Sequence, residues 1–234
     1  MKIKDTVFSF EDALRFLEED VKPQLGDGEP LAVFDTLKKE ESLPKQVTSA
    51  RGTAMYIKVA YKGRRGGKYR EVALHAVMTL VLKLVQSLKS VRLLNIQADG
   101  GLQVVFDTPM KKDVEDVITL SAQVRSINHV VLKKLGLNQD EQEITVGMDY
   151  GTISSYNAEE ELEEKFYAGD CMETAQRLTG LKQDCVVISE TIFINLSDDM
   201  QKNLFARYGT EGDLKYHYSP LINIRMNKWV VENQ

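Results

Sequence analysis

Long apolar runs, paired cysteines and an excess of positive charge are all missing from this chain of 234 residues. No stretch approaches the roughly 20 apolar residues of a membrane-spanning helix. The two cysteines, Cys171 and Cys185, form neither a metal-binding spacing nor a disulfide framework, which is typical of a reducing compartment. The formal charge of −5 argues against non-specific binding of nucleic acid. Without a signal-peptide core at its start, the chain is expected to be soluble and cytoplasmic, bound to no membrane.

What is present suits one large domain, since 43% of the residues are hydrophobic and can form a core. Residues 1–49 are expected to form an N-terminal extension that packs on this core, and residues 50–234 the main domain. In the extension, Ser9 is a good cap for a helix over Glu11–Val21. Proline and glycine then interrupt the chain between Pro23 and Pro30.

From Thr53 onward, strand and helix patterns alternate. The expected strands are Met55–Tyr61, Val91–Ile96, Leu102–Phe106, Ile144–Ile153 and Cys185–Ser189. The expected helices are Tyr69–Leu88, Asp113–Leu135, one starting near Asp170, and Asp198–Phe205. The order β-α-β-β-α-β-α-β predicts an α+β fold with a ferredoxin-like split βαβ core. Its antiparallel sheet should carry helices on one face, and a polar tail should close the chain.

The segment from Tyr167 to Leu178 is the first candidate for a functional site. A Gly169-Asp170 turn leads into a helix in which Glu173 and Arg177 are four residues apart and share a face. A guanidinium near the positive end of a helix suits an anionic, phosphate-bearing ligand. The alternative is an ordinary surface pair of glutamate and arginine.

A second candidate is the loop between the first strand and the helix that follows it. Five basic residues lie among its glycines, at positions 62, 64, 65, 68 and 70. Lys62, Arg64 and Arg65 could hold a triphosphate together with backbone N–H groups. The alternative is a solvated basic loop without a ligand.

Three motifs, taken together and in this order, point to a known family. They are the Asp99-Gly100 hairpin, the strand Gly147–Gly151, and the Gly169-Asp170…Arg177-Leu178 helix start followed by Val187-Ile188-Ser189. This set resembles the catalytic domain of class III nucleotide cyclases over roughly Ala54 to Leu196. The domain looks most similar to the soluble bacterial cyclases of Pycsar antiphage systems, which make cyclic pyrimidine nucleotides.

The resemblance implies conversion of a nucleoside triphosphate to a 3′,5′-cyclic nucleotide and pyrophosphate at a homodimer interface. In the family, two aspartates hold two divalent ions, Mg²⁺ or Mn²⁺, on the triphosphate. A helix start, usually from the partner subunit, supplies an asparagine and an arginine. On this chain the resemblance makes Asp99 a metal ligand and Arg177 the arginine that stabilises the transition state. Glu173 occupies the place of the asparagine and would position the ribose.

One position departs from the family pattern. Lys58 stands on the first strand where a metal-binding aspartate is expected, and a charged ammonium cannot ligate a divalent cation. Lys58 could instead neutralise phosphate. Asp149 lies in mid-strand, where the family does not usually place a ligand. For the base, the family positions correspond to Asn95 and to Phe166 or Tyr167, which do not distinguish a pyrimidine from a purine.

These observations leave three hypotheses. The chain is a metal-dependent nucleotide cyclase, a degenerate cyclase-like domain that dimerises and binds nucleotide without turnover, or a ferredoxin-like interaction module without a nucleotide site. Lys58 favours the second, because loss of one metal carboxylate should remove several kcal/mol of transition-state stabilisation.

Overall fold

The computed structural model describes residues 9–22, 46–63, 67–138, 141–157 and 165–233. Within these ranges one eight-stranded sheet runs in the order β2-β3-β1-β4-β6-β8-β7, and β5 pairs with β4. The strands are β1 Gln46–Tyr61, β2 Val91–Ile96, β3 Leu102–Asp107, β4 Gln142–Asn157, β5 Lys165–Ala168, β6 Val186–Ser189, β7 Arg207–Glu211 and β8 Leu214–Ser219. The helices are α1 Phe10–Phe16, α2 Lys68–Gln86, α3 Lys111–Lys134, α4 Asp170–Leu178, α5 Glu190–Phe193, α6 Asp198–Asn203 and α7 Ile224–Glu232, and a π-helical turn, η1 Leu17–Val21, follows α1.

The first half of the fold confirms the predicted ferredoxin-like core. β2, β3, β1 and β4 are neighbours in that order, and every adjacent pair is antiparallel. The connections through α2 and α3 complete the β-α-β-β-α-β order. β6 then extends the sheet parallel to β4, and the β7–β8 hairpin follows it.

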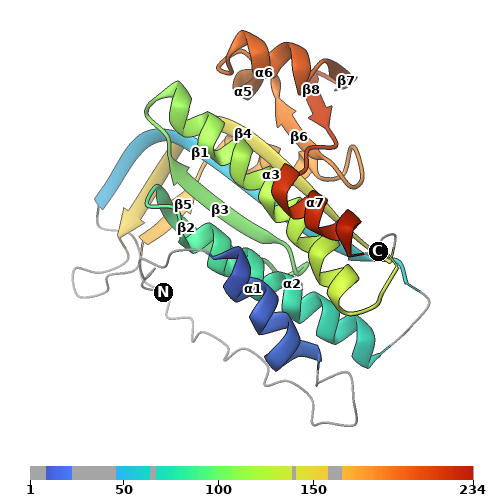
Figure 1. Cartoon of the computed structure of the whole chain (residues 1–234). Helices are drawn as coiled ribbons and strands as arrows, with labels where there is room; N and C mark the ends of the chain where they lie inside the picture. The colour runs from blue at the N-terminus through green and yellow to red at the C-terminus, as the bar shows by residue number, and fades with distance from the viewer. Residues whose placement is uncertain (1–8, 23–45, 64–66, 139–140, 158–164, 234) are drawn as a thin grey trace.

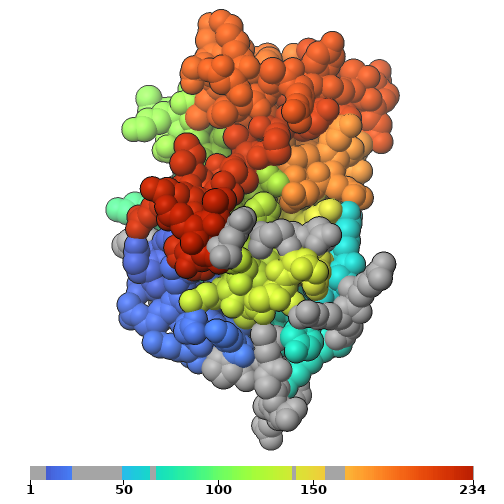
Figure 2. All heavy atoms as spheres, turned by 45° about the vertical axis from the view of Figure 1, so that its right-hand side comes forward, coloured from blue at the N-terminus to red at the C-terminus, as the bar shows by residue number. Residues whose placement is uncertain are grey.

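The long helices α2 and α3 cover one face of the sheet, as predicted (Figure 1). Apolar side chains of β1 and β3 that point to this face, among them Met55, Ile57 and Phe106, are fully buried against the two helices. α1 and α7 form an outer layer over them. Figure 2 shows the two terminal helices next to each other, where Phe10 meets Trp229 edge to face at 6.2 Å.

The short helix α4 lies on the opposite face, which we call the α4 face. Cys171, Met172 and Ala175 of this helix pack against Ala54 and Tyr56 of β1. The Gly147–Gly151 motif explains the close approach of α4 to β4. A Cβ atom added at Gly147 would lie 2.0 Å from the backbone oxygen of Ala175, so only glycine fits there.

The C-terminal part differs from the prediction. In place of a polar tail, residues 207–219 form the β7–β8 hairpin, which turns at Gly212 with a φ of 56°. Asn223 then caps α7, accepting a hydrogen bond from the Met226 N–H. The alternating strand pattern of β8 and the Asn223 cap were the signals that the sequence offered.

At the N-terminus, Ser9 caps α1 as predicted, accepting a hydrogen bond from the Asp12 N–H at 3.2 Å. Ala13, Leu17 and Val21 belong to the main apolar core. The division into residues 1–49 and 50–234 stays a prediction. In the part of the chain that the structure describes, no helix combines the length and apolar character needed to cross a membrane.

Candidate functional site

The predicted residues Lys58, Asn95 and Asp99 gather where the β2–β3 hairpin turns, on the α4 face. Tyr56 faces α4, and strand alternation places Lys58 on the same side of β1. Asn95 pairs with Gln103, which in turn pairs with Tyr56, so it shares this face. Asp99 lies in the turn itself. We call Tyr56, Lys58 and Asp99 the hairpin cluster.

Asp99 is held by two donors within its own chain. Its Oδ1 accepts a short hydrogen bond from the Tyr56 hydroxyl and one of 3.0 Å from the Gly101 N–H. These bonds, the Tyr56 one foremost, keep the pKa of Asp99 below its usual value. Burial, with the adjacent carboxylate, raises the pKa of the Tyr56 phenol. At Gly101 a Cβ would lie 2.2 Å from the Tyr56 hydroxyl, so the turn fits tightly over the phenol.

Lys58 is the cation of the cluster. Its side chain is exposed, and its charge acts on Asp99 to lower the pKa of that carboxyl further. Among the described residues Lys58 forms no hydrogen bond and no ion pair within 4 Å. The ammonium is therefore available to a ligand on the α4 face.

The donor set does not fit a two-metal site. Among the described residues no three His, Cys, Asp or Glu side chains come together as metal ligands would. Asp99 is a single carboxylate beside an ammonium, and one of its oxygens already accepts two hydrogen bonds. Mg²⁺ on a nucleotide is usually bound by one or two carboxylates together with the phosphates and water. For two ions the cluster offers one carboxylate where the family pattern has two.

Asp149 does not supply the missing carboxylate. It accepts hydrogen bonds from the Ser189 hydroxyl of β6 and from the Tyr150 N–H at 2.8 Å, and another from Thr174 of α4. Burial raises its pKa. The carboxyl group therefore ties α4 to β4 and β6 and is not open to a ligand.

On α4 the side chains of Glu173 and Arg177 are both exposed. Arg177 does not pair with Glu173. Its Nε lies 3.0 Å from Oε2 of Glu211, and its Nη2 donates to the Glu211 backbone oxygen at 3.3 Å. Both side chains of this pair are about half exposed, so a ligand anion could compete with Glu211 for the guanidinium. Next to Arg177, Gln176 reaches the Tyr56 hydroxyl at 3.5 Å.

The basic loop is only partly described. Lys62 is engaged, with its Nζ 2.6 Å from Oε2 of Glu143 and 2.8 Å from Oε1 of Gln183. Arg64 and Arg65 lie outside the described residues, and so does the side chain of Phe166. The predicted phosphate role of this loop stays a prediction.

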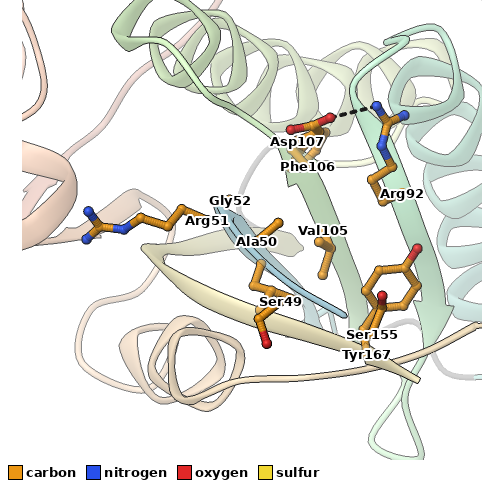
Figure 3. A pocket seen from close by; sticks show the side chains of 11 residues that line it. Ser49, Ala50, Arg51, Gly52, Arg92, Val105, Phe106, Asp107, Ser155 and Tyr167 are labelled. Atoms are coloured by element: carbon orange, nitrogen blue, oxygen red, sulfur yellow. Dashed lines mark hydrogen bonds and ion pairs between the residues drawn. The ribbon is translucent and has the colours of Figure 1, made fainter. Parts of the chain in front are cut away.

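A pocket of about 190 Å³ lies further back along β1, on the same face (Figure 3). Gly52 and Val105 form part of its floor, and Arg92 and Tyr167 stand on one side. Arg92 Nη2 bonds Oδ2 of Asp107 at 2.7 Å at the rim. The remaining lining residues are Ser49, Ala50, Arg51, Phe106, Ile153 and Ser155, of which Arg51 points away from the cavity.

The sequence anticipated this pocket only through Tyr167. Asn95, chosen as a base contact, is not among its lining residues, whereas Arg92 on the same strand is. The register of β2 shifts between Val91 and Leu93, so the direction of Arg92 does not follow from simple alternation. The sequence offered one signal for the role of Arg92, namely a basic residue within an otherwise mostly apolar strand.

Comparison with known proteins gives no matching family model and no matching curated protein. Solved structures do match. A class III adenylyl cyclase-like ATP-binding protein from Pseudomonas aeruginosa superposes with a TM-score of 0.59 at 14% identity, over 82% of this chain and 42% of that one. The chain thus spans less than half the length of that protein. The adenylyl cyclase CyaB from P. aeruginosa gives 0.60 at 13% identity, over 74% and 95%.

The guanylyl cyclase Cya2 superposes with a TM-score of 0.58 at 12% identity, over 76% of this chain and 95% of its own. At identities this low the similarity establishes the fold and nothing finer. The chain has the fold of class III adenylyl and guanylyl cyclase domains, as the sequence motifs predicted.

Proposed function

We propose that this chain is a cyclase-fold domain that binds a nucleoside triphosphate between two copies of itself and does not cyclise it by a two-metal mechanism. The observation that carries the proposal is the hairpin cluster. The charge near Asp99 on β1 is that of Lys58 and not of a second carboxylate, and Oδ1 of Asp99 already accepts from Tyr56 and Gly101. The geometry therefore favours the hypothesis of a degenerate cyclase-like domain that binds nucleotide without turnover.

The Arg92–Tyr167 pocket supports nucleotide binding. Its volume of about 190 Å³ is below the roughly 300–1,000 Å³ of pockets that enclose a whole small ligand, so it suits one part of a nucleotide. The Tyr167 ring offers an aromatic surface for a base, and Arg92 with Asp107 offers donors and acceptors at the rim. We assign the base to this pocket.

The position of α4 supports a dimer. Cys171, Met172 and Ala175 pack on the sheet over Ala54 and Tyr56, between the pocket and Lys58. This packed region separates the pocket from Lys58 of the same chain. In the dimer that we propose, the triphosphate of a nucleotide in the pocket extends to the hairpin cluster of a second copy. Arg177 contributes a guanidinium once a phosphate replaces Glu211 as its partner. A homodimer arranged in this way is part of the proposal.

One neighbour is described as a cyclase-like protein that binds ATP, which is the kind of activity proposed here. Others are described as cyclases. These neighbours favour the alternative to our proposal, an active nucleotide cyclase that forms a 3′,5′-cyclic product. Glu173 and Arg177, both exposed on α4, favour it as well. In that candidate Arg177 stabilises the transition state. A pyrimidine substrate and an antiphage role remain predictions from the resemblance.

Incubation with ATP, GTP, CTP or UTP and Mn²⁺, followed by mass spectrometry of the products, separates the two candidates. We expect at least one nucleotide to raise the thermal unfolding temperature and none to yield cyclic nucleotide and pyrophosphate. Cyclic product from the wild-type chain would establish the cyclase instead. No thermal shift with any nucleotide would support the interaction module.

The variant Lys58→Asp is the matched test of the hairpin cluster. It restores the acidic residue that the family resemblance places on the first strand. Product formation by this variant alone would show that the remaining machinery is intact and that Lys58 prevents turnover.

A further inference from the structure

The hairpin cluster differs in charge from a pair of metal-binding carboxylates. Two carboxylates carry −2 and would repel a triphosphate unless divalent cations lay between them. Lys58 and Asp99 together carry zero. The positive charge that stabilises a bound phosphate is thus supplied by the Lys58 side chain of β1.

Lys58 also has the freedom to act as that cation. It is exposed, and within the described residues its charge acts on Asp99 without a direct ion pair. Lys62, four residues further on, is by contrast bound to Glu143 and Gln183. A lysine ammonium is a compact charge with three donors, which suits phosphate oxygens.

Asp99, in turn, has a structural explanation that needs no metal. Its Oδ1 closes the turn on the Gly101 N–H and holds the Tyr56 hydroxyl, which also reaches Gln176 of α4. A metal ion at this oxygen would have to displace the Tyr56 bond. The carboxyl group therefore orders the turn next to Lys58.

We propose that Lys58 contacts the triphosphate directly in place of a divalent cation, so that nucleotide binding by this chain is independent of metal. This inference rests on the proposed function, because it concerns the same nucleotide. The substrate class it names is the metal-free nucleoside triphosphate. Pyrophosphate, which carries the same phosphate chemistry without a base, should bind the cluster more weakly.

The test is isothermal titration calorimetry of the full chain with each nucleoside triphosphate, once with excess Mg²⁺ and once with EDTA. We expect dissociation constants in the two buffers that agree within about threefold. Lys58→Gln should weaken binding about tenfold in both buffers, the loss of one charge-assisted hydrogen bond. Lys58→Asp should abolish binding in EDTA and recover part of it in Mg²⁺.

Lys202→Asp is the matched control, since Lys202 is an exposed lysine of α6 with the same change of charge. It should bind as the wild type does. Circular dichroism of each variant shows whether it is folded. Pyrophosphate in EDTA should bind the wild type measurably and Lys58→Gln less tightly.

Binding by the wild type in Mg²⁺ but not in EDTA would overturn the metal-free site and leave the proposed function standing. Equal binding by the wild type and Lys58→Gln would also overturn the metal-free site, because Lys58 would then make no contact with the phosphates. Absence of binding in both buffers would end both this inference and the proposed nucleotide function.

Discussion

Tyr56 and Gly101 donate to one oxygen of Asp99, and this arrangement accounts for the turn at the end of the hairpin. The relation between Lys58 and Asp99 came from the family resemblance, whereas the sequence itself placed Asp99 in a hairpin turn, because Asp-Gly between apolar runs is a strong turn signal. The sequence did not identify Tyr56 as the partner of Asp99. That contact joins residues 43 positions apart and depends on strand register, which local patterns do not reveal.

The first prediction concerns this bond. Tyr56→Phe removes the donor, so the pKa of Asp99 should rise toward its ordinary value. Because a lowered pKa contributes stability above the unfolded-state pKa, the wild type should lose stability as pH falls through the Asp99 pKa, and the variant should lose less. Carbon-detected NMR titration of the Asp99 carboxyl measures the shift. Tyr208→Phe, an exposed tyrosine on β7, should leave it unchanged.

Among the elements, α4 decides how much of the sheet remains open. The sequence predicted the helix start and the Gly147–Gly151 strand, and both are present. Their mutual packing was not predictable, because it depends on which face of the sheet the helix returns to. The β7–β8 hairpin was missed because its strands are short. The short helix α7 was missed although its apolar residues and the Asn223 cap were visible in the sequence.

The second prediction tests the contact between α4 and β4. Gly147→Ala should destabilise the fold by about 2–3 kcal/mol or displace α4, because the added Cβ meets the Ala175 backbone oxygen at 2.0 Å. Gly151→Ala should cost less, since its Cβ would lie 3.1 Å from Cys171 Cβ. Urea unfolding measures the loss of folding free energy in each of the two variants. Equal losses would contradict the packing described here.

The third prediction concerns Asp149, whose pKa is raised by burial beneath α4. A raised carboxyl pKa means that the folded state favours the protonated form. The associated stability is complete below the unfolded-state pKa and is lost as pH rises through the folded-state pKa. Asp149→Asn, a neutral mimic, should therefore gain stability relative to the wild type as pH rises from about 4 to 7.

Urea unfolding at several pH values measures this difference, with Asp116→Asn on the exposed side of α3 as the control. A gap between Asp149→Asn and the wild type that shrinks or stays constant as pH rises would contradict the account. The Ser189 and Tyr150 donors can still bond the amide oxygen, so the variant should fold.

At the scale of the whole molecule, a buried guanidinium connects the C-terminal residues to the core. Arg125 of α3 is 2% exposed, donates to the Leu221 backbone oxygen at 2.6 Å, and pairs with Asp184 at 2.9 Å. Nearby, the Asn223 N–H donates to Ser126 at 2.6 Å. Periodicity placed Arg125 within the predicted second long helix but gave no sign of these distant partners.

The fourth prediction follows from these bonds. Arg125→Met should destabilise the chain by about 2–3 kcal/mol, because the Leu221 carbonyl loses its donor and Asp184 loses its counter-charge. Limited proteolysis should then cleave near residues 220–224 earlier than in the wild type. Arg207→Met, at an exposed position of β7, should change neither result.

Native mass spectrometry of the wild-type chain with each nucleoside triphosphate tests the central claim most directly, because one spectrum reports subunit number, bound nucleotide mass and bound metal. The account predicts a dimer that carries intact nucleoside triphosphate without a divalent ion. A monomer without nucleotide, or a dimer whose bound mass is that of a cyclic nucleotide or of a metal–triphosphate complex alone, would contradict it.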